Sequence, residues 1–269
     1  MDLVWFIFEP FVRFFLNVWY TVTSTFHQFT AQMSDIHLHM GWVWSIALLF
    51  VVLHYGRRYP VVRQVSIAMS FLPVLIHELG HALMAKMTRS PVRNIHIVLT
   101  HLGQSHTGSQ GFADTVPRNK LSGVLIFLAG YLTPPLFFGL GFYFIHRHQA
   151  YIYILILLLL GIYYLMHSDQ KWIPIIIIIA MVMSGYQFYV SSDIIHYLHD
   201  EGYSIFLGLL LGEMIQSIII TTQLTFSRHT SEWDGSMLKD ETFVPTVVWW
   251  ALWTTFTVAV IIFAVLMHG

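Results

Sequence analysis

The segment LPVLIHELGHALMAK, residues 72–86, combines an apolar helical pattern with three polar side chains, His77, Glu78 and His81. It lies within an apolar block, about 64–88, that is long enough to cross the ~30 Å hydrocarbon core of a bilayer. A charged side chain at the centre of such a helix costs about 2.5 to 3.5 kcal/mol on insertion scales, so ionisable residues there are functional candidates. The segment therefore predicts a membrane helix that carries chemistry.

The composition of the whole chain is typical of a membrane protein. Of its 269 residues, 56% are hydrophobic and only 10% are charged, whereas roughly a quarter of a soluble domain is charged. The formal net charge of -1 provides no basic surface, so we expect no nucleic-acid partner. The chain has no cysteine, which excludes disulfides and thiolate metal sites. We expect a multi-pass protein of the cell membrane, in contact with the lipid bilayer.

Apolar blocks separated by short connectors define the expected architecture. The blocks lie at about 3–22, 41–56, 64–88, 121–145, 150–167, 172–192, 203–225 and 246–268. The first contains Glu9, Pro10 and Arg13, so lying in the interface is an alternative to crossing the bilayer. The prediction is an all-α polytopic membrane protein with about six to eight membrane helices. It forms one domain, with accessory helices in 1–63 and a core in 64–268. Basic residues are divided too evenly between the connectors to predict an orientation.

The polar segment after the motif helix has the pattern of a β-hairpin. Residues 93–102, RNIHIVLTHL, place Ile95 and Ile97 in alternation with His96 and Val98, the two-residue period of a strand. The following GQSHTGSQGF, residues 103–112, contains three glycines that favour turns. A small hairpin is therefore expected within 92–112.

The spacing of His77, Glu78 and His81 predicts a metal site. Residues four apart lie on one face of a helix, so His77 and His81 can bind the same ion. Glu78 is rotated away from that face and can approach a metal-bound water. This is the arrangement of H-E-x-x-H, with two zinc ligands and a general base. Pro73 removes one hydrogen bond and is expected to bend or loosen the helix just before the motif.

A catalytic zinc requires a third protein ligand, and the sequence leaves its identity open. Glu213 is favoured because it lies near the middle of the 203–225 block, at a depth comparable with His77. Asp169 lies between two apolar blocks, Asp193 at a helix end, and Asp234 in a WDG triplet within a charged connector. These three aspartates remain alternatives.

The motifs together resemble the site-2 protease clan, in particular a small bacterial branch of site-2-protease-like membrane metallopeptidases. Besides HELGHA, the resemblance is carried by LAGYLTPPLFFGLG at 128–141 and EWDGSMLKDETFVPTVVWWALW at 232–253. It covers about 70–268. The better-known members have an asparagine in the helix corresponding to 128–141 and an N-x-x-P…D-G pattern farther on, and both are missing here.

The resemblance implies a zinc endopeptidase that cuts membrane protein or peptide substrates within or near the bilayer. It also implies that the hairpin pairs with an unwound substrate strand, and that Gly130, Tyr131 and Pro134 shape the helix beside the motif. The expected function is thus intramembrane zinc proteolysis, with Glu78 as catalytic base and His77, His81 and Glu213 as metal ligands. A proton or metal-ion transporter and a non-catalytic adaptor with a protease-like fold are the alternatives.

Overall fold

The structure is a computed structural model. It describes residues 13–25, 27, 30–31, 36–99, 110–190, 193–227 and 233–268, with 184–190 and 193–199 described as backbone alone. The predicted segment at 3–22 is described only from Arg13, where it is helical, and the hairpin tip lies outside the described residues.

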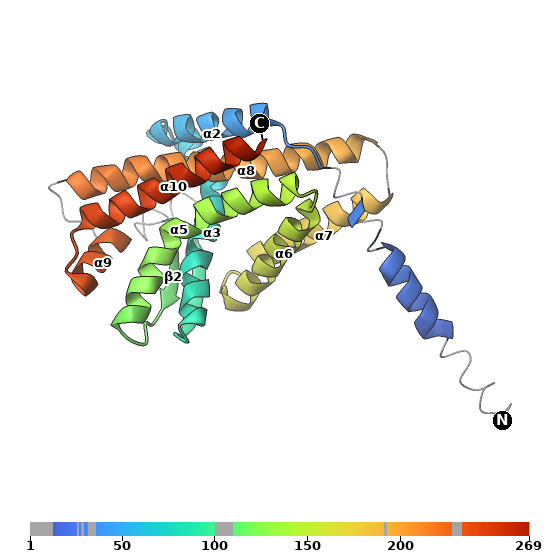
Figure 1. Ribbon diagram of the computed structural model, residues 1–269, viewed down its shortest axis with the longest axis horizontal. Coiled ribbons are helices and arrows are strands. Elements are labelled where there is room, and N and C mark those ends of the chain that lie inside the picture. Colours follow the sequence, from blue (N-terminus) through green and yellow to red (C-terminus); the bar gives the residue numbers. More distant parts are fainter. Residues whose placement is uncertain are drawn as a thin grey trace, which may run out of the picture.

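This part of the chain is mostly helical, with one small sheet beside α3 (Figure 1). In chain order the elements are α2 (Met40–Tyr55), α3 (Pro60–Met87), β1 (Val92–Ile97), β2 (Gly111–Thr115), α5 (Lys120–His146), α6 (Ala150–His167), α7 (Trp172–Val190), α8 (Asp193–Phe226), α9 (Asp234–Thr242) and α10 (Thr246–His268). Figure 1 shows α8 and α10 running side by side above α5, with the residues of α9 close to one end of α10. The predicted all-α architecture with a small β-hairpin is confirmed.

Five of the described helices are long and apolar enough to cross a membrane. They are α3, α5, α6, the Asp200–Phe226 part of α8, and α10. Shorter apolar helices occur at Met40–Tyr55 and Trp172–Met183. The chain is therefore a polytopic membrane protein.

Helix α3 carries the motif and is continuous through Pro73. It begins at Pro60, whose missing N–H costs nothing in the first turn, and Pro73 is buried in its interior. Pro73 was expected to bend or loosen the helix. The helix has no break there, since the residues on both sides of Pro73 are helical. After Met87 the chain turns through Arg89, with a φ of 57°, into the sheet.

The two strands form an antiparallel hairpin that packs on α3. Its register pairs Ile95 with Ala113 and Ile97 with Gly111, with an irregularity between Val92 and Asn94. Ile95 and Ile97 are fully buried, as their alternation predicted. The first residue of β2 consequently lies against the motif helix.

Helices α3 and α5 approach each other closely at a glycine. A side chain at Gly80 would overlap Thr133, and its Cβ would lie 2.9 Å from the carbonyl oxygen of Ala129. Such small residues allow helix backbones to come together inside a membrane. Gly80 thus sets the distance at which α5 faces the motif.

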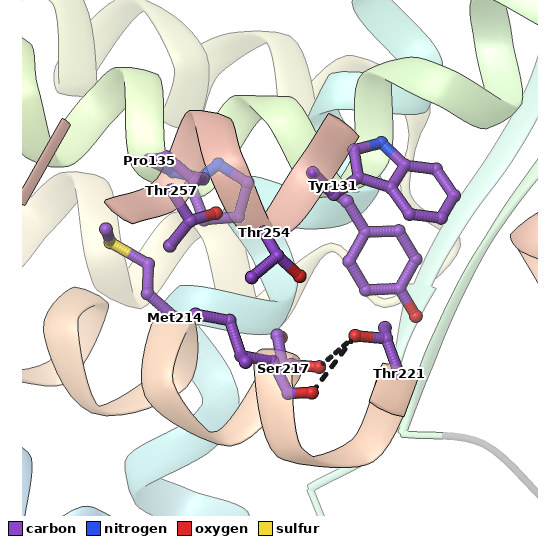
Figure 2. A pocket seen from close by; sticks show the side chains of 10 residues that line it. Tyr131, Pro135, Met214, Ser217, Thr221, Thr254 and Thr257 are labelled. Atoms are coloured by element: carbon purple, nitrogen blue, oxygen red, sulfur yellow. Dashed lines mark hydrogen bonds between the residues drawn. The ribbon is translucent and has the colours of Figure 1, made fainter. Parts of the chain in front are cut away.

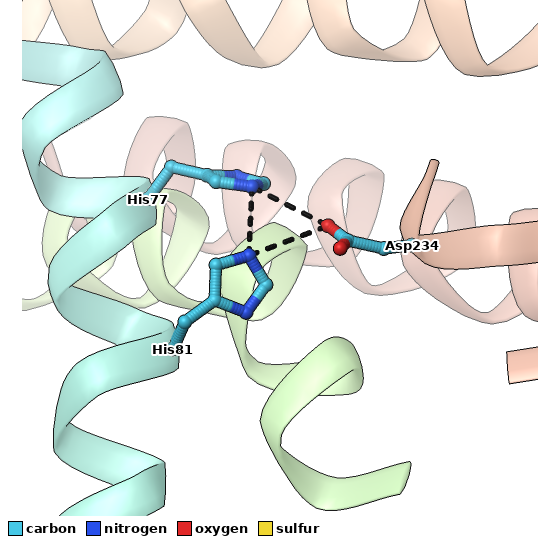
Figure 3. Close-up of side chains that lie close together, drawn as sticks. All are labelled: His77, His81 and Asp234. Carbon is cyan, nitrogen blue, oxygen red and sulfur yellow. Dashed lines mark hydrogen bonds and ion pairs between the residues drawn. The ribbon is translucent and has the colours of Figure 1, made fainter. Parts of the chain in front are cut away.

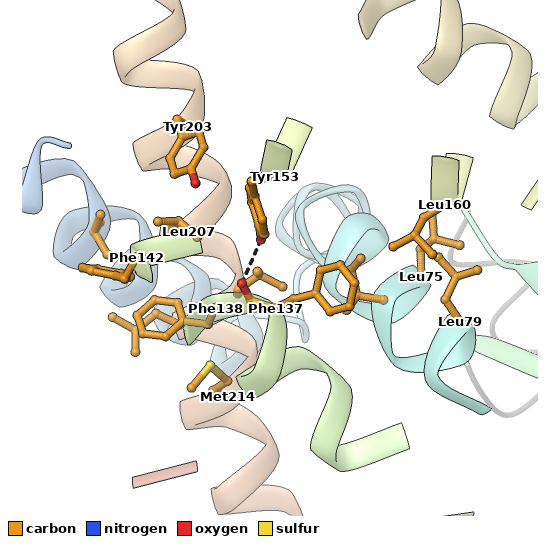
Figure 4. Packing of buried hydrophobic residues seen from close by; sticks show 14 of the residues in the cluster. Leu75, Leu79, Phe137, Phe138, Phe142, Tyr153, Leu160, Tyr203, Leu207 and Met214 are labelled. Atoms are coloured by element: carbon orange, nitrogen blue, oxygen red, sulfur yellow. Dashed lines mark hydrogen bonds between the residues drawn. The ribbon is translucent and has the colours of Figure 1, made fainter. Parts of the chain in front are cut away.

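The apolar core joins the motif helix to α5, α6 and α8. Figure 4 shows Leu75 and Leu79 of α3 near Leu160 of α6. Phe137 of α5 lies between this group and the side chains of Leu207 and Met214 on α8. Tyr153 of α6 is fully buried and donates a hydrogen bond to the carbonyl oxygen of Phe137. The motif helix α3 therefore shares one apolar core with α5, α6 and α8, which fixes its position.

Two features of the last third differ from the predicted segments. Helix α8 begins at Asp193, about ten residues before the apolar block at 203–225, because polar residues lower hydropathy without preventing a helix. The connector between α8 and α10 contains the nine-residue helix α9. Trp233 precedes α9, and its backbone N–H donates a hydrogen bond to the Ser236 hydroxyl. This bond gives the N–H of the residue before the helix a partner within the first turn.

Candidate metal centre

His77 and His81 present their imidazoles to one point beside α3. Their Nε2 atoms are 3.1 Å apart, and the ring planes are nearly perpendicular at 80°. Figure 3 shows both rings extending from the same side of the helix, as the four-residue spacing predicted.

Asp234, from the first turn of α9, completes a group of three. Its Oδ2 lies 3.4 Å from Nε2 of His77 and 3.4 Å from Nε2 of His81. Figure 3 shows its carboxylate facing the two rings from the opposite side. In the described part of the chain, this is the group whose ligand atoms lie close enough together to hold a metal ion.

The donor set and its spacing fit zinc. Zinc binds imidazole nitrogen and carboxylate oxygen at about 2.0 to 2.2 Å in a tetrahedron, which puts ligand atoms about 3.3 Å apart. The distances of 3.1 and 3.4 Å match that spacing. The Nδ1 atom of His81 is 2.7 Å from the Ile126 carbonyl oxygen and must donate to it, so Nε2 retains its lone pair for a metal. Three protein ligands would leave one position open.

The electrostatic surroundings of Asp234 favour its ionised form. Burial alone would raise its pKa, but His81 and His77, when their rings are protonated, place positive charge beside the carboxylate. That charge outweighs burial and brings the pKa of Asp234 below its ordinary value. A carboxylate must be ionised to bind a metal, and Asp234 meets that condition.

The structure favours Asp234 over Glu213, the residue that depth in the membrane had suggested. Glu213 lies on α8, where it accepts a hydrogen bond of 3.0 Å from Ser217. It is close enough to His77 and Arg57 to interact with their charges, but it does not belong to the group of three. Asp234 lies in a connector but reaches the histidines through α9, a placement that depth in the membrane does not reveal.

Of the other two candidates for the third ligand, Asp169 makes its contacts outside the group of three. Asp169, in the turn between α6 and α7, accepts a hydrogen bond of 2.5 Å from the side chain of Asn94, and its backbone N–H donates to Asn94 Oδ1. It thus ties the hairpin to that turn. Asp193 begins α8, and its side chain lies outside the described part.

Glu78 is adjacent to the three candidate ligands without being one of them. It is 7% exposed, and the backbone N–H of Ala113 in β2 is near enough to interact with its carboxylate. A Cβ at Gly111, the first residue of β2, would lie 3.0 Å from Cγ and 3.1 Å from Oε1 of Glu78. The hairpin therefore holds the carboxylate in position, a contact that the sequence did not reveal.

Helix α5 forms a further wall of the site through Gly130 and Tyr131. A side chain at Gly130 would overlap the His81 ring, and its Cβ would lie 2.8 Å from Nε2 of His77. The Tyr131 ring makes an edge-on contact with His77, with ring centroids 4.8 Å apart. The resemblance had implied that both residues shape this helix, and they face the histidines directly.

A small cavity extends from Tyr131 between α5, α8 and α10 (Figure 2). Its volume of about 20 Å³ has room for a water molecule. Hydroxyl groups contribute much of its lining, from Ser217, Thr221, Thr254 and Thr257. The hydroxyl of Thr254 is buried without a hydrogen-bond partner among the described residues. Water is the natural partner for such a group.

Comparison with known proteins identifies a family for the chain. A family model described as Peptidase M50B-like matches residues 42–264, which is most of the chain. Comparison with curated proteins and with solved structures finds no significant match. The matched region contains every element of the candidate centre, from α3 to α9. The resemblance seen in the sequence motifs is thereby confirmed, and the chain belongs to the Peptidase M50B-like family of site-2-protease-like metallopeptidases.

Proposed function

We propose that this protein is an intramembrane zinc endopeptidase of the cell membrane, which hydrolyses peptide bonds of membrane-embedded or membrane-proximal substrates. The observation that carries the proposal is the group of His77, His81 and Asp234, with spacing that fits zinc, next to the buried carboxylate of Glu78. A transporter needs ligands but no base placed beside them.

Each residue then has a distinct role. His77, His81 and Asp234 would hold the ion, which would supply Lewis-acid polarisation and lower the pKa of the attacking water toward neutrality. Glu78 accepts a proton as the water oxygen attacks the carbonyl carbon. It passes that proton to the amide nitrogen as the C–N bond breaks, so the products are a carboxylic acid and an amine.

The position of the hairpin supports the approach of the substrate along β2, beside Glu78. Strand β2 lies directly beside Glu78 through Gly111 and Ala113. An extended substrate segment that pairs with the hairpin would bring its backbone to the same place. Unwinding is part of this proposal, because the amide bonds of an intact helix are shielded by their own hydrogen bonds.

The decisive experiment separates metal binding from chemistry. Purified protein should hold about one zinc ion per chain, and His77→Ala should lose it. Glu78→Gln should retain zinc but lose cleavage of a helical membrane substrate, while Glu241→Gln, a matched change at the end of α9, should leave both unchanged. Cleavage retained in Glu78→Gln would contradict the mechanism. Zinc uptake into vesicles by Glu78→Gln would favour a transporter.

A further inference from the structure

Tyr131 is held rigidly at the metal centre by aromatic rings. Its ring meets His77 edge-on, with planes at 84° and centroids 4.8 Å apart. Trp253 of α10 lies 4.6 Å away and Trp233, which precedes α9, lies 6.3 Å away, both measured between ring centroids. With neighbours from three segments, the direction of its hydroxyl group is fixed.

The hydroxyl of Tyr131 makes no hydrogen bond within the part of the chain that the structure describes. Figure 2 shows it pointing away from the backbone of α5, toward the side where Thr221 of α8 lies. The charges of Asp234, Glu213 and Glu78 all act on it. The hydroxyl is therefore near enough to the candidate centre for the charges of that centre to act on it, and it has a hydrogen to donate.

A free donor in this place matters because of the charge that develops during peptide hydrolysis. As water attacks the carbonyl carbon, negative charge grows on the carbonyl oxygen, and a fixed donor aimed at it accelerates the reaction. The segment AGYLTPPL has no asparagine to do this. The other hydroxyl of that segment, Thr133, donates to the carbonyl oxygen of Ala129 and is occupied. Within this segment, Tyr131 carries the hydroxyl that remains able to donate.

We propose that Tyr131 is a catalytic residue whose hydroxyl donates a hydrogen bond to the scissile carbonyl oxygen of the substrate. This inference rests on the proposed function and adds to it the group that stabilises developing negative charge. The hydroxyl stays protonated throughout, so no bond to Tyr131 forms or breaks. The ring keeps its contact with His77 while the hydroxyl faces the substrate.

The experiment removes the hydroxyl and keeps the ring. Tyr131→Phe should lower kcat about 100-fold, leave KM nearly unchanged and retain zinc. A peptide phosphonate, whose charged oxygens mimic the attacked carbonyl, should lose affinity by a similar factor, whereas a substrate-like peptide should not. Tyr143→Phe is the matched control, because Tyr143 lies on the same helix with its side chain exposed.

The possible outcomes separate this inference from the function on which it rests. Wild-type kcat in Tyr131→Phe would overturn the role of Tyr131, and the protease proposal would still stand if Glu78→Gln loses cleavage. Loss of zinc from Tyr131→Phe would assign the hydroxyl to maintaining the site and would also overturn the inference. A wild-type protein that cleaves nothing and does not bind the phosphonate would remove both proposals.

Discussion

At the scale of single residues, the pairing of the two histidines was predictable and the placement of Asp234 beside them was not. His77 and His81 are four positions apart, so the geometry of a helix alone brings their rings together. Asp234 is brought to them by tertiary structure across most of the chain, and no local pattern contains that information. The one available sign was its WDG triplet near the apolar block at 246–268, which carried less weight than the depth of Glu213.

The first prediction compares the two acidic candidates. Asp234→Ala should weaken zinc binding by more than the roughly 10- to 100-fold that follows loss of a residue supporting a ligand, because it removes a ligand itself. Glu213→Ala should retain zinc, since its carboxylate is bonded to Ser217 and stands outside the group of three. Zinc titration of both variants provides the measurement. The reverse pattern would restore Glu213 as the third ligand.

The second prediction concerns the glycine against which the imidazoles pack. Gly130→Ala would insert a methyl group into the His81 ring and within 2.8 Å of Nε2 of His77. Because both rings must move to admit it, zinc content and cleavage should fall together. Gly123→Ala, on the same helix, meets Pro117 at an ordinary 3.6 Å and should behave as wild type. Full zinc occupancy in Gly130→Ala would show that the histidines can bind metal in another position.

At the scale of elements, the hairpin does more than the sequence suggested. Its alternating pattern correctly placed Ile95 and Ile97 on the buried face. The pattern could not show that the second strand begins against Glu78, because that contact depends on how the hairpin lies on α3. The Glu78 side chain is therefore positioned by β2 as well as by its own helix.

The third prediction tests this positioning role. Gly111→Ala would place Cβ 2.7 Å from Val74 and 3.0 Å from Cγ of Glu78, so the carboxylate must shift. We expect kcat to fall by about 10-fold or more, while zinc binding is unchanged because none of the three ligands is touched. Arg93→Ala, at an exposed position of the same hairpin, is the control. Equal loss of zinc and activity would mean that the hairpin supports the whole centre.

Helix α9 shows why elements between apolar blocks are hard to predict. Its sequence DGSMLKDET is polar, and only Gly235 and Leu238 are buried. A hydropathy profile of the sequence therefore does not reveal this helix. What fixes the helix is its start at Trp233 and Ser236, together with its packing on α5 and α10.

At the scale of the whole molecule, length and composition were enough to predict a polytopic helical protein, because a bilayer admits few other solutions. The same reasoning predicted most helix positions to within a few residues. It could not predict which helices are neighbours, and the centre depends on that. Three segments distant in sequence, α3, α5 and α9, converge there, and the close approach at Gly80 brings two of them together.

The last prediction follows from this convergence. Helix α9 packs on α5 and α10, and its connection to α3 runs through Asp234 and the two histidines. A bound zinc would therefore tie α9 to the motif helix. At a free concentration about 100 times Kd, such a ligand stabilises the bound state by about 2.7 kcal/mol. Chelation should lower the Tm in detergent and speed trypsin cleavage after Lys239, which lies exposed on α9.

A second lysine in the same molecule makes the test specific. Lys171, exposed in the turn between α6 and α7, donates to the carbonyl oxygen of Leu165 and has no connection to the centre, so its cleavage should not respond to chelation. The Asp234→Ala variant should be cleaved quickly after Lys239 with or without a chelator, because it lacks the carboxylate that would connect α9 to the zinc ion. Equal protection of Lys239 in zinc-loaded and chelated wild type would mean that α9 is held by its packing alone. Zinc would then complete a site that the helices have already assembled.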